Sequence, residues 1–87
     1  AYEPVWAVGT GRAASTGDIV RSHKAIRERL ATITPDGGEV AILYGGSVKP
    51  DNAGEIMAAP GVDGVLVGGA CLDAASFLSI YRAGGGT

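Results

Sequence analysis

The sequence predicts an α/β fold in which three βα units contribute their strands to one parallel sheet. One observation is a pattern that occurs three times: a short apolar run, a glycine-bearing loop and an amphipathic helix. A second is that the later apolar runs are almost unbroken, which is typical of parallel strands buried on both faces. A third is that 15 of the 87 residues are glycine, more than twice the usual share of about 7%. The glycines cluster after the apolar runs, so we expect them at the C-terminal ends of the strands.

Composition excludes several classes of protein. Nine acidic and seven basic residues give a net charge of −2, which argues against a strongly basic nucleic-acid binder. No apolar run approaches the roughly 20 residues of a membrane-spanning helix, and no signal-peptide pattern opens the chain. The single cysteine, Cys71, excludes an internal disulfide and a cysteine metal cluster, and it fits a reducing compartment. Because the chain opens inside an apolar run without a methionine, we interpret Ala1 as a cut end.

The first unit consists of the apolar run 1–8 and a long helix after it. Ser15 or Thr16 is expected to cap that helix, and Asp18 resembles the acidic residue of a capping box. Pro35 and the glycines that follow it end the helix. Steps of four, three, four and three residues define one apolar face, formed by Ile19, His23, Ile26, Leu30 and Ile33.

The second and third units repeat this order. The run 40–44 predicts a strand, and Pro50 is expected in the first turn of a short helix that contains Ala53, Ile56 and Met57. The run 62–67 predicts the third strand. The last helix has one apolar face at offsets of zero, three, four and seven residues, formed by Ala74, Phe77, Leu78 and Tyr81.

Three glycine loops at one sheet edge indicate a ligand site more strongly than a single tight turn would. Such loops expose backbone N–H groups, and a helix that starts nearby adds its positive end, so an anion such as phosphate is favoured. No loop contains the P-loop signature, and Ala14 stands where the dinucleotide fingerprint usually has its last glycine, although an alanine variant exists. A better match is the phosphate site of a (β/α)8 barrel, formed here by residues 45–47 and 68–69.

Glu3 is a candidate general base, because it lies at the end of the first apolar run beside a glycine loop. From the pattern alone, a surface glutamate or an ion-pair partner is the more common explanation. Pro4 stiffens one side of the next segment, residues 7–11 are small, and residues 12–14 lead into the helix. Such a segment is typical of a hinged lid.

Three segments resemble the triosephosphate isomerase family. Residues 2–11 (YEPVWAVGTG) resemble its catalytic glutamate and lid, residues 44–48 (YGGSV) its next loop, and residues 61–70 (GVDGVLVGGA) its last loop. Their order and spacing match over essentially the whole chain. The resemblance implies interconversion of dihydroxyacetone phosphate and glyceraldehyde 3-phosphate through an enediol, without a cofactor or a metal. This enzyme is itself the standard example of a glutamate base beneath a closing loop.

The resemblance also implies a role for individual residues. Glu3 would be the base, and Leu66 would press on it and keep water away. The phosphate would accept hydrogen bonds from the backbone N–H groups of Gly9, Ser47, Gly68 and Gly69. Tyr44 and Ser47 would hold the closed lid near Ala14 and Gly11. The lid and its latch would comprise Pro4, Val5, Trp6, Ala7, Val8, Thr10, Gly11, Arg12, Ala13, Ala14 and Tyr44.

Four other residues are expected to have structural roles. Cys71 stands where this family usually has serine, and we expect it to be a small residue that is buried or half-buried. His23 lies on the sheet-facing side of its helix. Asp63 is expected to form an ion pair or to cap a helix, and Trp6 is expected to pack at the hinge.

The length indicates a partial TIM barrel. Eight units take about 250 residues, so three units predict about 94, close to the 87 present. By the resemblance, residues 1–87 form βα units 6 to 8, with no second domain. The lysine and histidine that the family uses on the enediolate, and its dimer loop, would lie outside this segment.

These features define the expected partners. The complete enzyme would be a cytoplasmic homodimer that acts on a small triose phosphate, with no nucleic-acid or membrane partner. A three-stranded piece has two bare sheet edges, so its own partner would be the remaining N-terminal barrel segment or a second copy. The alternative is a non-catalytic half-barrel that binds phosphate weakly at most. Another phosphate-binding barrel enzyme is a third hypothesis, against which the glutamate-bearing lid argues.

Overall fold

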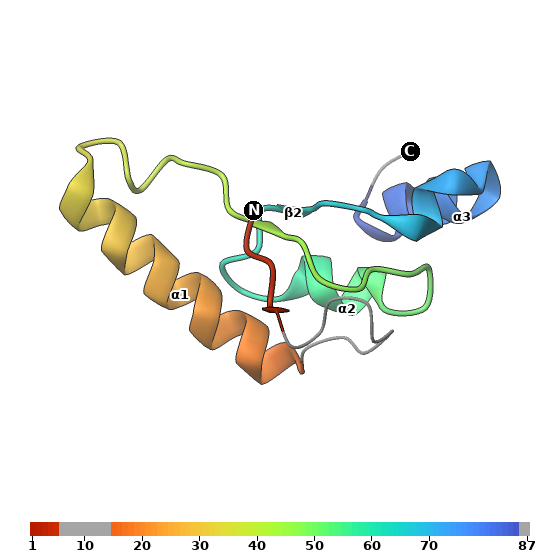
Figure 1. Cartoon of the computed structure of the whole chain (residues 1–87), viewed down its shortest axis with the longest axis horizontal. Coiled ribbons are helices and arrows are strands. Elements are labelled where there is room, and N and C mark those ends of the chain that lie inside the picture. The colour runs from red at the N-terminus through yellow and green to blue at the C-terminus, as the bar shows by residue number, and fades with distance from the viewer. Residues whose placement is uncertain (6–14, 86–87) are drawn as a thin grey trace.

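A computed structural model describes residues 1–5 and 15–85 of the chain (Figure 1). Strands and helices alternate along it, as the sequence predicts. The elements in chain order are α1 (Thr16–Ile33), β1 (Leu43–Tyr44), α2 (Ala53–Ala58), β2 (Gly64–Val65), the 3-10 helix η2 (Gly69–Leu72) and α3 (Ala74–Ala83). None of the described helices is both long and apolar enough to cross a membrane.

Three strand segments lie side by side and run parallel. In the β1–β2 pair, Leu43 lies opposite Gly64 and Tyr44 lies opposite Val65. Tyr2 forms an isolated parallel bridge with Tyr44 on the other side of β1. The regular strands are shorter than the apolar runs 40–44 and 62–67, since the β1–β2 ladder pairs only two rows of residues.

The helix caps follow the sequence closely at α1 and less closely at α2. The Ser15 side chain accepts a hydrogen bond from the Asp18 backbone N–H at 3.2 Å, which selects Ser15 as the N-cap. Helix α2 begins at Ala53, not at Pro50 as predicted. Pro50 lies in the preceding turn, where the Asn52 side chain accepts from the Lys49 backbone N–H at 2.7 Å.

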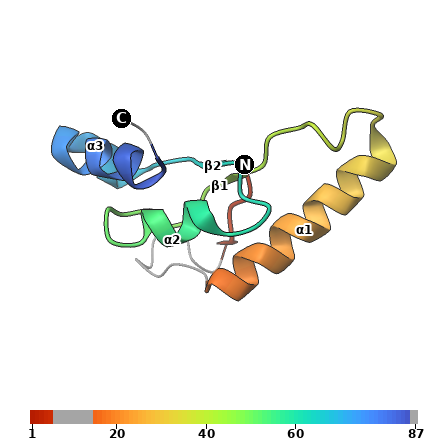
Figure 2. The same ribbon diagram turned by 180° about the vertical axis from the view of Figure 1, so that it is seen from behind.

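One apolar core lies between the strands and the helices. It contains Ile19, Tyr44, Val48, Ala53, Ile56 and Ile80. In Figure 1, α1 and α2 lie below the strand segments and α3 lies at the opposite end of the molecule from the yellow end of α1. Figure 2 shows the same arrangement from behind. In both views no helix covers the strands from above.

Two predicted helix faces are only partly buried, because one side of the described structure is left uncovered. Ile33 ends the predicted face of α1 but is 62% exposed. In α3, Phe77, Leu78 and Tyr81 are exposed, whereas Ile80 is buried. The periodicity correctly identifies an apolar surface on each helix. The described residues supply no layer against those positions, so the helices bury only the part that faces the core.

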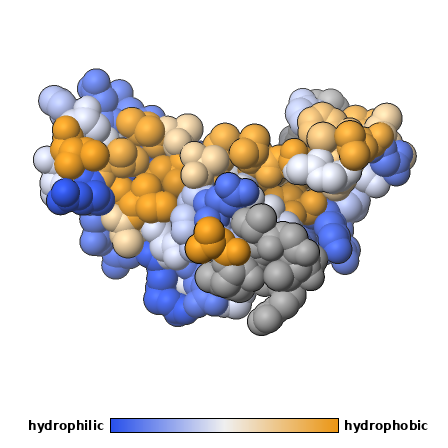
Figure 3. Space-filling view, in the orientation of Figure 1, coloured by the Kyte–Doolittle hydropathy of each residue, from blue (hydrophilic) through white to orange (hydrophobic). Residues whose placement is uncertain are grey.

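The molecule exposes more surface than a compact monomer of its mass. Its accessible surface is 5350 Å² for 8.7 kDa, whereas the scaling for monomers gives about 4,700 Å². Figure 3 shows apolar residues along the hollowed upper rim, from the region of α1 to α3. The exposed large apolar residues are Val5, Ile33, Val40, Leu66, Leu72, Phe77, Leu78 and Tyr81.

The N-terminal edge of the sheet is held by Arg27 and Asp63. Arg27 Nη1 donates to the carbonyl oxygens of Gly37 at 2.7 Å and Val40 at 2.5 Å, and Nη2 donates to Asp63 Oδ2 at 2.9 Å. The same carboxylate oxygen accepts from the Ile42 backbone N–H at 2.8 Å. These bonds confirm the predicted ion pair of Asp63 and join the second half of α1 to the loop after it and to the start of both strands.

Candidate active site

The three parallel segments bring three predicted site regions to one edge. The Gly45 N–H donates to the Tyr2 carbonyl at 2.6 Å, and the Leu66 N–H donates to the Tyr44 carbonyl at 2.9 Å. Tyr2, Tyr44 and Val65 therefore form one row across the sheet. Glu3, Gly45 and Leu66 directly follow these residues in the chain, beyond the last paired positions, and we call these three residues the edge row.

Glu3 is exposed, whereas the residues on either side of it pack toward the helices. The Tyr2 hydroxyl receives a hydrogen bond from Ser22 in α1 at 3.2 Å, so Tyr2 points into the helix layer. Pro4 is buried, whereas Glu3 and Val5 are exposed. The Glu3 carboxylate therefore lies at the surface of the described structure.

Leu66 is also exposed at this edge. Its neighbours Val65 and Val67 pack against the core, and Leu66 itself is 55% exposed. Gly45 lies between Glu3 and Leu66 in the edge row and adds no side chain there. Because adjacent strands lie about 4.8 Å apart, the two outer backbones lie within reach of a glutamate and a leucine side chain. The predicted role of Leu66, to keep water away from Glu3, stays a prediction.

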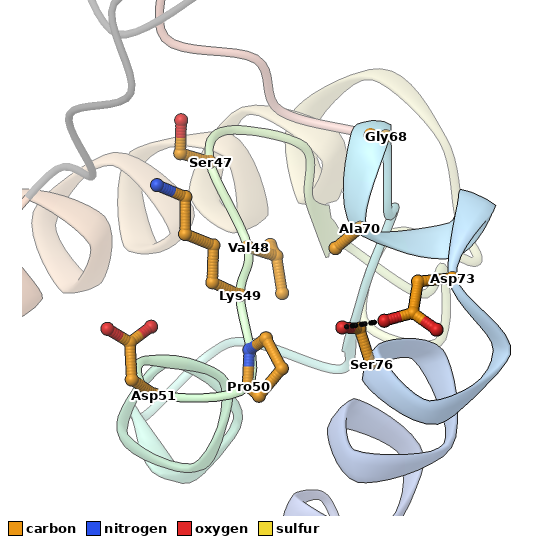
Figure 4. A pocket seen from close by; sticks show the side chains of 10 residues that line it. Ser47, Val48, Lys49, Pro50, Asp51, Gly68, Ala70, Asp73 and Ser76 are labelled. Carbon is orange, nitrogen blue, oxygen red and sulfur yellow. Dashed lines mark hydrogen bonds between the residues drawn. The ribbon is translucent and has the colours of Figure 1, made fainter.

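A cavity of about 630 Å³ lies beside this row, between the loops that follow β1 and β2 (Figure 4). Its lining includes three of the four predicted phosphate donors, Ser47, Gly68 and Gly69. Glu3 does not line it, although Gly45 in the row of Glu3 is only two residues from Ser47. A Cβ atom added to Gly68 or Gly69 would meet nothing within 4 Å. The backbone there is open to a ligand, and packing does not require glycine.

Four polar residues of the cavity were not identified from the sequence: Lys49, Asp51, Asp73 and Ser76. Lys49 is exposed and lines the cavity, and in Figure 4 its side chain extends toward Ser47. Asp73 accepts hydrogen bonds from the Ala75 backbone N–H at 3.2 Å and from Ser76 Oγ at 3.0 Å. Its place directly before the last apolar helix is an N-cap signal. The Asp73 carboxylate is thus held by the start of α3, and Lys49 contributes the positive charge.

Gly46 has a different role from the other glycines of this edge. A Cβ atom at Gly46 would overlap the hydroxyl end of Tyr44, whose side chain is fully buried. The glycine is therefore required by the close approach of the Tyr44 ring to its own loop. Tyr44, the predicted latch residue, is fixed in the core beneath the loop that carries Ser47.

The lid itself cannot be compared with the prediction. Pro4 and Val5 are described, but the remaining predicted lid residues and the phosphate donor Gly9 lie outside the described residues. These are Trp6, Ala7, Val8, Gly9, Thr10, Gly11, Arg12, Ala13 and Ala14.

His23 and Cys71 have contrasting surroundings. His23 is fully buried, and its Nδ1–H donates to the Gly61 carbonyl at 3.2 Å. Burial lowers the pKa of His23 below its usual value of 6.5, against the opposing influences of the Gly61 carbonyl and the Asp63 carboxylate. This confirms a buried structural position for His23. Cys71 is exposed in η2, so the predicted burial is wrong, because η2 packs little of its own surface into the core. Within the described part of the chain, no group of His, Cys, Asp and Glu side chains is arranged to hold a metal ion.

Comparison with known proteins agrees with this geometry. A family model of triosephosphate isomerase matches residues 1–84. The triosephosphate isomerase of Acinetobacter baylyi is 58% identical over 83 residues, covering 95% of this chain and 31% of that protein. That of Caulobacter vibrioides is 60% identical over 84 residues, covering 95% of this chain and 33% of its own length.

A solved structure extends the likeness to three dimensions. The crystal structure of triosephosphate isomerase from Bartonella henselae superimposes with a TM-score of 0.84 at 41% identity, covering 94% of this chain and 32% of that one. The partial TIM-barrel fold predicted from the sequence is thereby confirmed. The chain spans about a third of the length of the curated relatives it matches. The chain belongs to the triosephosphate isomerase family.

Proposed function

We propose that this chain supplies the base and most of the phosphate site of a triosephosphate isomerase, as its βα units 6 to 8. The observation that carries the proposal is the paired row of Tyr2, Tyr44 and Val65, which Glu3, Gly45 and Leu66 directly follow, with a cavity nearby that Ser47, Gly68 and Gly69 line. A carboxylate, an apolar residue within its reach and open backbone at one sheet edge suit proton transfer on a small phosphorylated substrate.

In the proposed reaction, Glu3 removes a proton from the carbon next to the substrate carbonyl. The electron pair of that C–H bond moves through carbon to the carbonyl oxygen and forms an enediolate. The proton of the neighbouring hydroxyl then moves to this oxygen, and Glu3 returns its proton to the carbon that carried the original carbonyl, so the carbonyl group has moved by one carbon. Backbone N–H groups of Ser47, Gly68 and Gly69 hold the phosphate while Lys49 adds positive charge. Glu3 is exposed in this chain alone, so its proposed function needs further structure to exclude water.

The exposed apolar surface supports the proposal that this chain is one part of a larger barrel. Leu66, Phe77, Leu78 and Tyr81 lie on the uncovered faces, and we propose that the N-terminal part of the barrel covers them in the complete enzyme. That enzyme would be a cytoplasmic homodimer. The second candidate is that the 87-residue chain by itself is a non-catalytic half-barrel. The large accessible surface of this chain favours that description of the isolated piece.

A chimera tests the proposal. The N-terminal part of the Acinetobacter baylyi relative, up to the start of the matched region, is joined to residues 1–87 of this chain. A coupled assay then measures isomerisation of glyceraldehyde 3-phosphate by the chimera and by the 87-residue chain alone. We expect activity from the chimera and none from the isolated chain. An inactive chimera that is folded, as judged by circular dichroism, would contradict the proposal.

Glu3 is tested in the same chimera. Glu3→Asp withdraws the carboxylate by about one C–C bond length, and we expect kcat to fall about 100-fold, since misplacement by about 1 Å has an effect of that size. Glu28→Asp, the same change at an exposed glutamate of α1, is the matched control. An equal rate for Glu3→Asp and the parent chimera would remove Glu3 from the role of base.

A further inference from the structure

We propose that His23 is a positioning residue for Glu3, acting through the side chain of Tyr2. This inference rests on the proposed function of Glu3. It assigns a role in the reaction to a buried residue of α1 that faces away from the cavity and that the proposed chemistry does not use.

Tyr2 connects the base to helix α1. It precedes Glu3 directly, and its backbone pairs with β1 through the Leu43 carbonyl at 2.7 Å and the Gly45 N–H at 2.6 Å. These bonds hold the first segment on one side only, since the described residues place no strand on its other side. The Tyr2 side chain provides the second anchor, where its hydroxyl accepts the hydrogen bond from Ser22.

The ring of His23 packs directly against that anchor. The ring centroids of Tyr2 and His23 lie 5.6 Å apart in an edge-to-face arrangement with an interplanar angle of 87°. His23 also lies 6.4 Å from the Tyr44 ring, and Tyr44 is the residue whose backbone pairs with Tyr2. One histidine therefore contacts both residues that determine where the backbone of Glu3 begins.

His23 is itself held firmly. It is fully buried, and its Nδ1–H bond to the Gly61 carbonyl fixes the ring at the turn that precedes β2. Gly61 has φ of +86°, and an added Cβ would contact His23 Cβ at 3.5 Å. The positive φ makes the turn depend on glycine, and the turn carries the carbonyl that accepts the bond from the His23 ring. A fixed ring can transmit its position to Tyr2, and through the backbone to Glu3.

The surroundings of the His23 imidazole disfavour its protonation. Among the described residues Nε2 has no hydrogen-bond partner. Burial lowers the pKa of His23, the Gly61 carbonyl and the Asp63 carboxylate oppose that shift, and the two tyrosine rings lie beside the imidazole. Protonation would place a charge without a partner beside Tyr2.

Two substitutions at His23 separate positioning from stability in the chimera. His23→Asn removes the ring contact with Tyr2, and we expect kcat to fall about tenfold while KM changes less than about twofold, because the base shifts but the phosphate site does not. His23→Phe keeps a ring against Tyr2 but loses the bond to Gly61. We expect it to be less stable than the parent and to keep kcat within about twofold of the parent value.

A stability control and a spectroscopic readout complete the test. Ile80→Val, in the core of α3, lowers stability without touching Tyr2, and its kcat is expected to equal that of the parent. A His23→Asn enzyme with parental kcat would overturn the inference. If the parent chimera is inactive, the proposed function fails, but the backbone amide resonances of Tyr2 and Glu3 still report positioning. They should shift in His23→Asn and not in Ile80→Val, and unchanged resonances would overturn the inference independently.

Discussion

The two edges of the small sheet are built in opposite ways. At the N-terminal edge, Arg27 and Asp63 bind each other and the backbone of the chain around the strands. At the C-terminal edge, Glu3 is exposed and Gly68 and Gly69 leave open space around their backbone. One edge has its polar groups paired within the chain, and the other presents them outward. In barrel enzymes the first arrangement is typical of stability and the second of catalysis.

This contrast predicts that the largest stability effect lies at the N-terminal edge. Arg27→Ala removes the donor of three hydrogen bonds and leaves Asp63 without its cation, so we expect the chimera to lose about 3 kcal/mol of unfolding free energy. Arg21→Ala in the same helix is the matched control. Arg21 forms only an exposed ion pair with Asp18, and its loss is expected to cost less than about 0.5 kcal/mol. Urea unfolding measures both, and equal effects would refute the contrast.

Within the C-terminal edge, two glycines are expected to respond differently. Gly46→Ala places a methyl group against the buried Tyr44, and overpacking of this kind costs about 2 kcal/mol. Gly68→Ala enters open space, and we expect its unfolding free energy to stay within about 0.5 kcal/mol of the parent chimera. Urea unfolding of the two variants decides the point. A larger loss for Gly68→Ala would mean that this loop is packed and not open.

The smallest effect expected is a pH dependence from His23. Unfolded His23 takes up a proton near pH 6.5, whereas burial makes the folded residue take one up only at lower pH. Between these two pKa values the unfolded state binds more protons than the folded state. The contribution of His23 to the free energy of unfolding is therefore fully present above pH 6.5 and is lost as the pH falls toward the folded pKa. Urea unfolding at about pH 8 and about pH 5 should show a smaller acid loss in His23→Phe. An identical loss in both proteins would assign it to other groups.

Much of the fold is predictable from local sequence signals. Ser15 is followed by Asp18 and an apolar spacing of three and four, which is sufficient to place α1 and its N-cap. The order of apolar runs and glycine loops likewise predicts three parallel segments with their C-terminal ends together. The positions of Ser47, Gly68 and Gly69 around one cavity follow from that topology.

Other features depend on contacts that no local sequence pattern predicts. Nothing near Gly46 in the sequence shows that Tyr44 would fold over it, so the packing role of that glycine is visible only in three dimensions. The apolar positions of α3 mark a surface that needs a partner, but periodicity does not say whether this chain supplies it. The contact of His23 with Tyr2 joins residues 21 positions apart in the chain, and no local pattern predicts it.

We expect the N-terminal edge to determine stability and the C-terminal edge to determine catalysis, and one paired measurement tests this division. Glu3→Asp and Arg27→Ala are made separately in the chimera, and kcat per folded enzyme and the urea midpoint are measured for each. We predict that Glu3→Asp lowers kcat about 100-fold with an unchanged midpoint. Arg27→Ala should lower the midpoint and leave kcat within about twofold of the parent value. A Glu3→Asp enzyme that keeps its kcat, or an Arg27→Ala enzyme that loses kcat without losing stability, would contradict the account.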